Sequence, residues 1–213
     1  MREIMISIQP QFVEKILNGE KTIEIRKTMP KCELPCKVYI YCTKSKPYLY
    51  RIDDDNNFEL TNKLRFEEDC FVKDYDAQNS KVVAEFTLNK IQEYEFELWD
   101  RNTFESIGLV YYDCETGERE VNVFETDNEI EYTLFAKKSC LNLPQLRKYL
   151  GQGISTCYAW HIDNLKIYDK PKELSEFTHN VPDYRNGVVM YPLKKEPLKR
   201  PPQSWCYVEK VGK

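Results

Sequence analysis

Two basic residues and one acidic residue follow a glycine at short spacing near the start of the chain. Lys21, Glu24 and Arg26 all lie within the seven residues after Gly19. A lysine or an arginine can contact a phosphate or carbonyl group, and arginine offers a planar, bidentate contact. A carboxylate such as Glu24 can accept hydrogen bonds from an exocyclic amine, as carboxylates do when proteins read cytosine. These residue types suit a polar pocket for a nucleobase.

A purely structural interpretation of the same residues stays open. Glu24 and Arg26 can form an ion pair on the surface beside an amphipathic helix, a contact of little energetic value. A binding site for a base also needs an aromatic side chain for stacking. The candidates for that role are Tyr158, Trp160 and Trp205.

Hydrophobic periodicity predicts the elements that carry these residues. Residues 3–8 alternate as a strand, and a helix begins at Pro10, with its apolar stripe at Phe12, Val13, Ile16 and Leu17. Gly19 is the expected C-terminal stop of this helix. Residues 22–26 form the next strand, where period two places Thr22, Glu24 and Arg26 on one face. We expect that face to meet a cleft or solvent, and the isoleucines between to meet the core.

Later segments predict more strands than helices. Strands are expected at 37–42 and 81–91, and a hairpin from 155–162 and 165–168 around Asp163-Asn164. Residues 143–150 are expected to form a short helix that begins near Pro144 and ends at Gly151.

Two acidic stretches and a proline-rich tail complete the chain, which at 213 residues suits a single domain over 1–213. Residues 46–80 are expected to form an inserted hairpin and loop, and 93–137 an irregular insertion with one short strand near 120–124. The tail 171–213 is expected to wrap the domain in extended form. It carries the basic residues Lys194, Lys195, Lys199 and Arg200, which suit either phosphate contacts or a solvated charged face.

Composition narrows the function classes. The formal net charge of −4 lacks the basic excess of a nonspecific nucleic-acid binder but allows a local basic patch or a small ligand. No apolar stretch reaches the length of a membrane span, and the N-terminus has no continuous apolar core, so we expect a cytoplasmic protein without a membrane partner. The eight cysteines are then expected to be thiols. One C-x3-C pair without a second tight pair predicts no metal site, and no glycine-rich phosphate loop occurs, so no cofactor is predicted.

The run from Ile6 to Lys27, ISIQPQFVEKILNGEKTIEIRK, resembles the N-terminal signature of the ASCH family, a branch of the PUA-like superfamily. In that signature a helix ends in Gly, and a Lys and a polar strand follow, as in Gly19, Lys21, Thr22, Glu24 and Arg26. The segments KVVAEFTLNKI, STCYAWHIDNLKIYDKP and PPQSWCYVE are also similar to ASCH proteins of phage and bacterial origin. The resemblance implies an α+β fold: a small mixed, mostly antiparallel β-barrel with peripheral helices and two inserted segments.

The same resemblance implies a ligand class. Related PUA, YTH and EVE domains bind RNA or modified bases, so the expected partner is RNA, a nucleotide or a modified nucleoside. Some small ASCH proteins hydrolyse acetylated cytidine, and ribonuclease activity is attributed to others. The hydrolases have a nucleophilic Thr where this chain has Glu24, and Thr22 lies one pleat away, about 7 Å. Lys21, Thr22 and Glu24 are therefore catalytic candidates only if the chain is an enzyme, with Glu24 as a general base on water in a second route.

A third interpretation assigns function to the acidic insertions. A phage protein that mimics nucleic-acid charge to bind a host protein would use 46–80 and 93–137, and the acidic net charge agrees with this. We expect deletion of either insertion to spare nucleotide binding if the Gly19–Lys27 segment is the site, and to abolish function if the insertions bind a protein.

Overall fold

The computed structural model describes residues 2–52, 57–63, 77–98, 106–112, 119–125, 134–151, 156–185 and 188–211. The chain divides into two compact units, and each is described by itself. The first unit comprises Met1–Asn18, Cys32–Thr87 and Asp163–Lys213. The second unit comprises Gly19–Lys31 and Leu88–Ile162. The single domain expected from the sequence stays a prediction.

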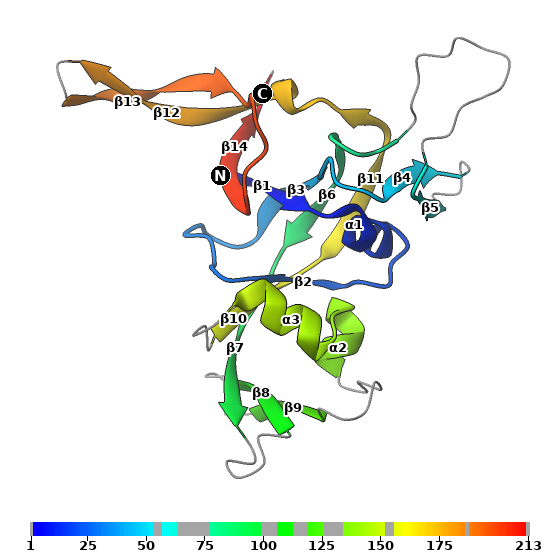
Figure 1. The fold of residues 1–213 in the computed structure, drawn as a ribbon. Helices are drawn as coiled ribbons and strands as arrows, with labels where there is room; N and C mark the ends of the chain where they lie inside the picture. Colours follow the sequence, from blue (N-terminus) through cyan, green and yellow to red (C-terminus); the bar gives the residue numbers. More distant parts are fainter. Residues whose placement is uncertain are drawn as a thin grey trace, which may run out of the picture. The chain divides into compact units, whose positions relative to one another are not determined.

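A seven-stranded sheet in the order β11-β6-β3-β1-β14-β12-β13 forms the first unit (Figure 1). Its strands are β1 (Glu3–Ile8), β3 (Cys36–Cys42), β6 (Val82–Leu88), β11 (Asp163–Lys172), β12 (Phe177–Arg185), β13 (Val188–Pro197) and β14 (Trp205–Lys210). β1 is parallel to β3 and antiparallel to β14. β12 is antiparallel to both β13 and β14, and β11 is antiparallel to β6. A buried apolar cluster holds these strands together, formed by Met5, Tyr39, Tyr41, Val82, Phe177, Leu198 and Val208.

The helix predicted near the N-terminus is confirmed as α1 (Pro10–Leu17). Its apolar stripe is buried at Val13, Ile16 and Leu17, whereas Phe12 is only half-buried, and each such side chain contributes about 1.5–3 kcal/mol when fully buried. Gly19 has φ +77°, a left-handed conformation that glycine adopts without strain, and the helix ends there. The predicted inserted hairpin is present as β4 (Tyr48–Arg51) paired with β5 (Phe58–Thr61), while residues 64–76 of that insertion lie outside the described residues.

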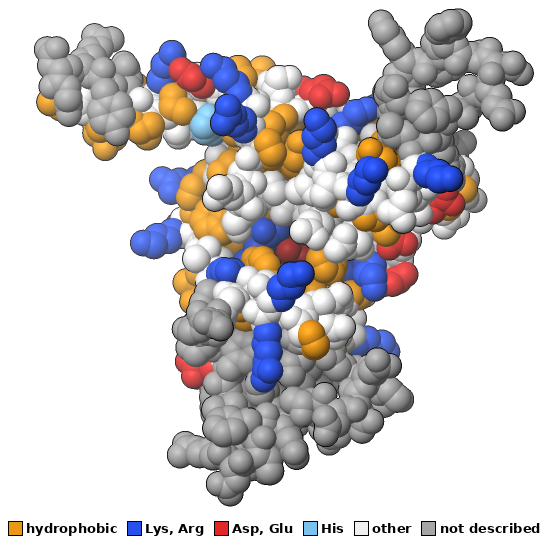
Figure 2. Space-filling view, in the orientation of Figure 1, with side chains coloured by type: hydrophobic (Ala, Val, Ile, Leu, Met, Phe, Trp, Pro, Cys, Tyr) orange, Lys and Arg blue, Asp and Glu red, His pale blue; other side chains and the backbone are white. Residues whose placement is uncertain are grey.

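The C-terminal tail adds strands to the sheet instead of wrapping the fold in extended form. After the short helix η1 (Leu174–Glu176), β12 pairs with β14 only at Phe177 and Thr178, whereas its pairing with β13 continues to Arg185. β12 and β13 thus extend as a two-stranded hairpin, which exposes Tyr191 at 80%. Lys and Arg side chains gather beside hydrophobic ones over this hairpin (Figure 2).

A five-stranded antiparallel sheet in the order β2-β10-β7-β8-β9 forms the second unit. Its strands are β2 (Ile23–Arg26), β7 (Ile91–Leu98), β8 (Ser106–Tyr112), β9 (Arg119–Glu125) and β10 (Thr156–His161). Two helices accompany it, α2 (Leu134–Ser139) and α3 (Leu143–Leu150). Phe135 of α2 packs edge-on against Tyr94 of β7, with ring centroids 5.0 Å apart, so α2 covers one face of the sheet.

Three expectations about strands are wrong. The strand expected over 81–91 breaks at Asn89 and Lys90, and its two parts belong to different sheets as β6 and β7. The stretch 93–137 contains strands β8 and β9 as well as most of β7, where only the strand near 120–124, which is β9, was predicted. The hairpin around Asp163-Asn164 does not form, because β10 already pairs with β2 and β7 along its two edges and β11 pairs with β6.

The predicted fold class is confirmed at the level of a mixed α+β fold with mostly antiparallel sheets. Among the described strands no sheet closes on itself, since β11 and β13 end one sheet and β2 and β9 the other. Within the same described ranges, no helix combines the length and the apolar character needed to cross a membrane.

Candidate functional site

Strand β2 presents the residues singled out in the sequence. It lies at the edge of the second unit's sheet and is antiparallel to β10, with Arg26 opposite Tyr158 and Glu24 opposite Trp160. Ile23 and Ile25 alternate with these residues and are 2% and 3% exposed, as the period-two pattern predicts. The buried isoleucines fix the register of β2 and therefore the direction of its polar side chains.

Lys21, Glu24 and Arg26 come together around one carboxylate, and we call these three residues the buried cluster. Arg26 Nη2 lies 3.1 Å from Glu24 Oε1, and Lys21 Nζ lies 3.3 Å from Glu24 Oε2. Each oxygen of Glu24 thus faces a different cation. Lys21 Nζ also donates a 2.5 Å hydrogen bond to the main-chain oxygen of Ser139, the last residue of α2. A cation at the carbonyl end of a helix is electrostatically favourable.

The cluster is buried, and this corrects the expectation that its polar face meets a cleft or solvent. Lys21, Glu24 and Arg26 are only 2%, 8% and 4% exposed. The structural alternative of a weak surface ion pair is also wrong, because the pair between Glu24 and Arg26 exists but is shielded from water. Burial of these charges is tolerated because every oxygen of the carboxylate has a cationic partner.

Burial lowers the pKa of Lys21 below its ordinary value of 10.5, because the charged ammonium loses its water shell. The negative charge of Glu24 and its hydrogen bond oppose this shift, and the neighbouring Arg26 adds to it. A lysine with a lowered pKa loses its proton more readily than an exposed lysine does. The neutral amine that results can accept a proton in a reaction.

Tyr149 of α3 is a site residue that the sequence analysis missed. Its pKa is raised mainly by burial of the hydroxyl and is lowered in turn by the charge of Arg26 and a hydrogen bond with that side chain. Tyr149 is nonetheless 37% exposed, and Lys27 Nζ lies 5.4 Å from the centre of its ring. The helix was expected, but no local pattern indicates a contact between residues 149 and 26, which are far apart in the chain.

The three predicted aromatic residues have different environments. Tyr158 shares a face of the sheet with Arg26 as its cross-strand partner, is half-buried, and its hydroxyl lies 3.5 Å from Glu93 Oε1. Trp160 is fully buried, so its ring belongs to the core and presents no face for stacking in this structure. Trp205 is half-buried on β14 of the first unit, where its ring packs edge-on with Tyr207 at 5.5 Å.

Thr22 does not take the position expected from strict alternation. It precedes β2 and is exposed, whereas Glu24 is buried. Its main-chain N–H donates to Lys138 and its carbonyl oxygen accepts from Ile162, so the backbone here joins α2 to the end of β10. The shared strand face that would align its hydroxyl with Glu24 is therefore absent.

Within the described ranges, no three side chains of His, Cys, Asp or Glu form a group that could bind a metal ion. His161 instead contacts the amide oxygen of Gln92 through Nε2 at 2.5 Å.

Comparison with known proteins gives one curated relative and a set of solved structures. No family model matches the chain. An ASCH domain-containing ribonuclease from Zymomonas mobilis subsp. mobilis is 37% identical over 43 residues, which is 20% of this chain and 29% of that protein. The match thus spans less than a third of the relative's length.

Solved structures of an ASCH protein from the same species cover most of the chain. The crystal structure of ASCH from Zymomonas mobilis has a TM-score of 0.48 at 17% identity, over 98% of this chain and 88% of that one. A mutant form of that protein gives the same TM-score at 16% identity, over 99% and 92% of the two chains. The comparisons confirm the resemblance of this chain to the ASCH family.

Proposed function

We propose that this chain binds RNA, a nucleotide or a modified nucleoside through the second unit, at the surface formed by Tyr149 and Lys27 and supported by the buried cluster. The observation that carries this proposal is that the exposed ring of Tyr149 has Lys27 Nζ 5.4 Å from its centre and the charge of Arg26 nearby. An exposed aromatic ring next to positive charge is a combination that proteins use to bind single-stranded nucleic acid.

Each group has a separate role in this proposal. The ring of Tyr149 stacks on a base, and the exposed ammonium of Lys27 contacts a phosphate. Arg26 is itself 4% exposed, so it acts by holding the Tyr149 hydroxyl, while Glu24 fixes the guanidinium and Lys21 ties Glu24 to the end of α2. Tyr158, half-buried opposite Arg26, is the second aromatic side chain at this surface.

RNA is favoured within this ligand class by the local similarity to a protein named as a ribonuclease. The net charge of −4 agrees with a small binding surface. It does not agree with a broad basic face that binds double-stranded nucleic acid. Two further expectations from the sequence belong to the same proposal: nucleotide binding beside the Gly19–Lys27 segment, and a phage origin.

Hydrolysis of a modified pyrimidine nucleoside or of RNA is the second candidate function. It is favoured by the lowered pKa of Lys21, since a lysine that loses its proton readily can activate a hydroxyl group or water. Thr22 is a weak candidate for the nucleophile because it lies outside the strand. Glu24 is a weak candidate for the general base because both of its oxygens face cations.

Fluorescence anisotropy with a labelled single-stranded RNA oligonucleotide tests the proposal. We expect Tyr149→Ala to weaken binding by about 5- to 150-fold, since loss of base stacking costs about 1–3 kcal/mol, and Tyr149→Phe to retain stacking. Tyr191→Ala is the matched control, because Tyr191 is 80% exposed but belongs to the β12–β13 hairpin of the first unit. Equal affinity of Tyr149→Ala and the wild-type protein would overturn the proposal.

Recovery of the oligonucleotide separates binding from hydrolysis. Mass spectrometry of RNA and acetylated cytidine after incubation should return both unchanged if the chain is a binding protein. Cleaved or deacetylated product that disappears with Lys21→Met, while circular dichroism shows that the variant is still folded, would establish the hydrolase instead. The matched lysine control is Lys44→Ala, at an exposed position of the first unit.

A further inference from the structure

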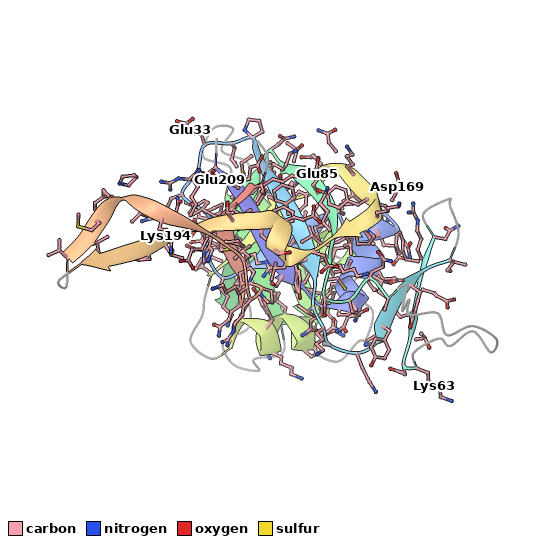
Figure 3. All side chains as sticks on the ribbon, turned by 90° about the horizontal axis from the view of Figure 1, so that it is seen from above. Glu33, Lys63, Glu85, Asp169, Lys194 and Glu209 are labelled. Carbon is pink, nitrogen blue, oxygen red and sulfur yellow. The ribbon has the colours of Figure 1, made fainter. Side chains whose placement is uncertain are left out.

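Two cysteines in the connection between β2 and β3 are in sulfur–sulfur contact. The Cys32 thiol donates to the sulfur of Cys36, with the two Sγ atoms 3.4 Å apart. Cys36 is the first residue of β3 and is 2% exposed, while Cys32 is half-buried. The three residues between them are exposed, and Glu33 lies at the outer edge of the fold (Figure 3). Cys32 is thus the more exposed of the two residues, and the sulfur of the buried Cys36 lies against its thiol.

We propose that Cys32 and Cys36 form an oxidative modification site, at which a hydroperoxide converts the two thiols into an intrachain disulfide. The sulfur atoms must approach by about 1.4 Å to reach the length of a disulfide bond. The exposed segment between the cysteines can absorb this movement, because only Cys36 is anchored in the sheet. The proposal does not depend on the ligand of the second unit.

The environments of the two cysteines assign their roles. Cys32 is the thiol that a hydroperoxide reaches, and its sulfur takes one oxygen to give a sulfenic acid while the peroxide is reduced to water or an alcohol. The Cys36 sulfur then attacks the Cys32 sulfur, the S–S bond forms, and the hydroxyl of the sulfenic acid leaves with the thiol proton as water. Two electrons pass from the thiols to the peroxide in total.

The order of these steps follows from burial. Burial raises the pKa of Cys36 to about 12, with the neighbouring Cys32 thiol adding to the shift, so Cys36 is a poor first nucleophile toward a reagent in solution. Its attack becomes effective only on a sulfur that is already oxidised and in contact. Cys42 and Cys157 differ from Cys32, because both are fully buried, and burial raises the pKa of each to about 12.

The sequence provides a direct readout of the disulfide. Lys31 precedes Cys32 and Lys37 follows Cys36, so trypsin releases both cysteines in the single peptide CELPCK. The native full-length protein is treated with a small excess of hydrogen peroxide, remaining thiols are alkylated after denaturation, and the digest is analysed by mass spectrometry without reduction. We expect this peptide to lack both alkyl groups and two hydrogen atoms, and to recover both thiols after treatment with dithiothreitol.

Single variants test the assigned roles. Cys36→Ala should leave Cys32 as a sulfenic acid that dimedone traps, and Cys32→Ser should leave Cys36 reduced under the same peroxide treatment. Cys206→Ser, a half-buried cysteine on β14, is the control that should not change disulfide formation. The proposal is overturned if native protein accumulates Cys32 sulfinic acid without the cyclic peptide, or if Cys32 pairs with a different cysteine of the chain.

Discussion

Glu24 Oε1 lies 3.1 Å from Arg26 Nη2, and the two side chains are only 11% and 5% exposed. An ion pair this deep gains strong Coulomb attraction but has lost the hydration of both charges, so its net contribution to stability is small. The situation changes when one partner is removed, because the remaining charge then stays buried without compensation. Mutations in the buried cluster therefore act on folding as well as on any bound ligand.

Glu24→Ala should destabilise the protein strongly, by about 3–5 kcal/mol, the cost of breaking a buried ion pair. The substitution leaves the positive charges of Lys21 and Arg26 close together with their shared carboxylate gone. Urea unfolding followed by circular dichroism measures the change.

The matched control is Glu209→Ala, which removes the carboxylate of an exposed ion pair with Lys195. Both partners are more than half exposed, so we expect a loss of no more than about 1 kcal/mol. Similar losses for Glu24→Ala and Glu209→Ala would contradict the buried position of Glu24.

Lys21 should make the stability of the protein rise with pH in the alkaline range. The pKa of Lys21 in the folded state is below 10.5, its ordinary value. At a pH between the folded-state pKa and 10.5, the unfolded chain therefore binds more protons at Lys21 than the folded protein does. Stability at this site therefore increases with pH across that window and levels off above 10.5. The free energy of unfolding is measured by urea titration at a series of pH values for the wild-type protein and Lys21→Met.

The difference between these two proteins isolates Lys21, because other titrating groups are common to both. It should shift in favour of the wild-type protein as the pH rises. A difference that is constant, or that falls with pH, would show that the folded pKa of Lys21 is not lowered.

Local patterns in the sequence predicted the elements around the site well. The strand over 3–8, the helix from Pro10, its end at Gly19 and the strand before Lys27 follow from spacing of a few residues, and the structure contains each of them. The pair between Glu24 and Arg26 was only one of the alternatives, and it was expected on the surface. Their burial was not predicted, because alternation along a strand shows which residues share a face and not what covers that face.

Pairing between distant strands accounts for the remaining errors. Five prolines after Glu173 indicated an extended tail, yet Pro192 and Pro197 lie within β13. β13 is the edge of its sheet, and an edge strand tolerates proline because one side of its backbone makes no ladder hydrogen bonds. Likewise, the contact of Arg26 with Tyr149 depends on where α3 packs, and no spacing in the sequence encodes that position.

Asn142→Ala should weaken the helix that positions Tyr149. Asn142 accepts a hydrogen bond from Gln145 N at 2.9 Å, and the Gln145 side chain accepts in return from Asn142 N at 3.0 Å, which forms a capping box at the start of α3. Loss of such a cap costs about 1 kcal/mol. Urea unfolding should show this loss, while Asn142→Ser should retain most of the stability because serine also caps helices.

Lys27→Ala should reduce the salt dependence of RNA binding without loss of stability. Lys27 is exposed and lies over the ring of Tyr149, so its removal takes away one phosphate contact from the proposed surface and no buried group. In a plot of log affinity against log salt concentration, the slope should become shallower by about one. The exposed Lys44 has the same charge on the first unit, and Lys44→Ala should leave the slope unchanged. An unchanged slope for Lys27→Ala would show that the phosphate contacts lie elsewhere, because each lost phosphate contact lowers the number of counterions released and so changes the slope.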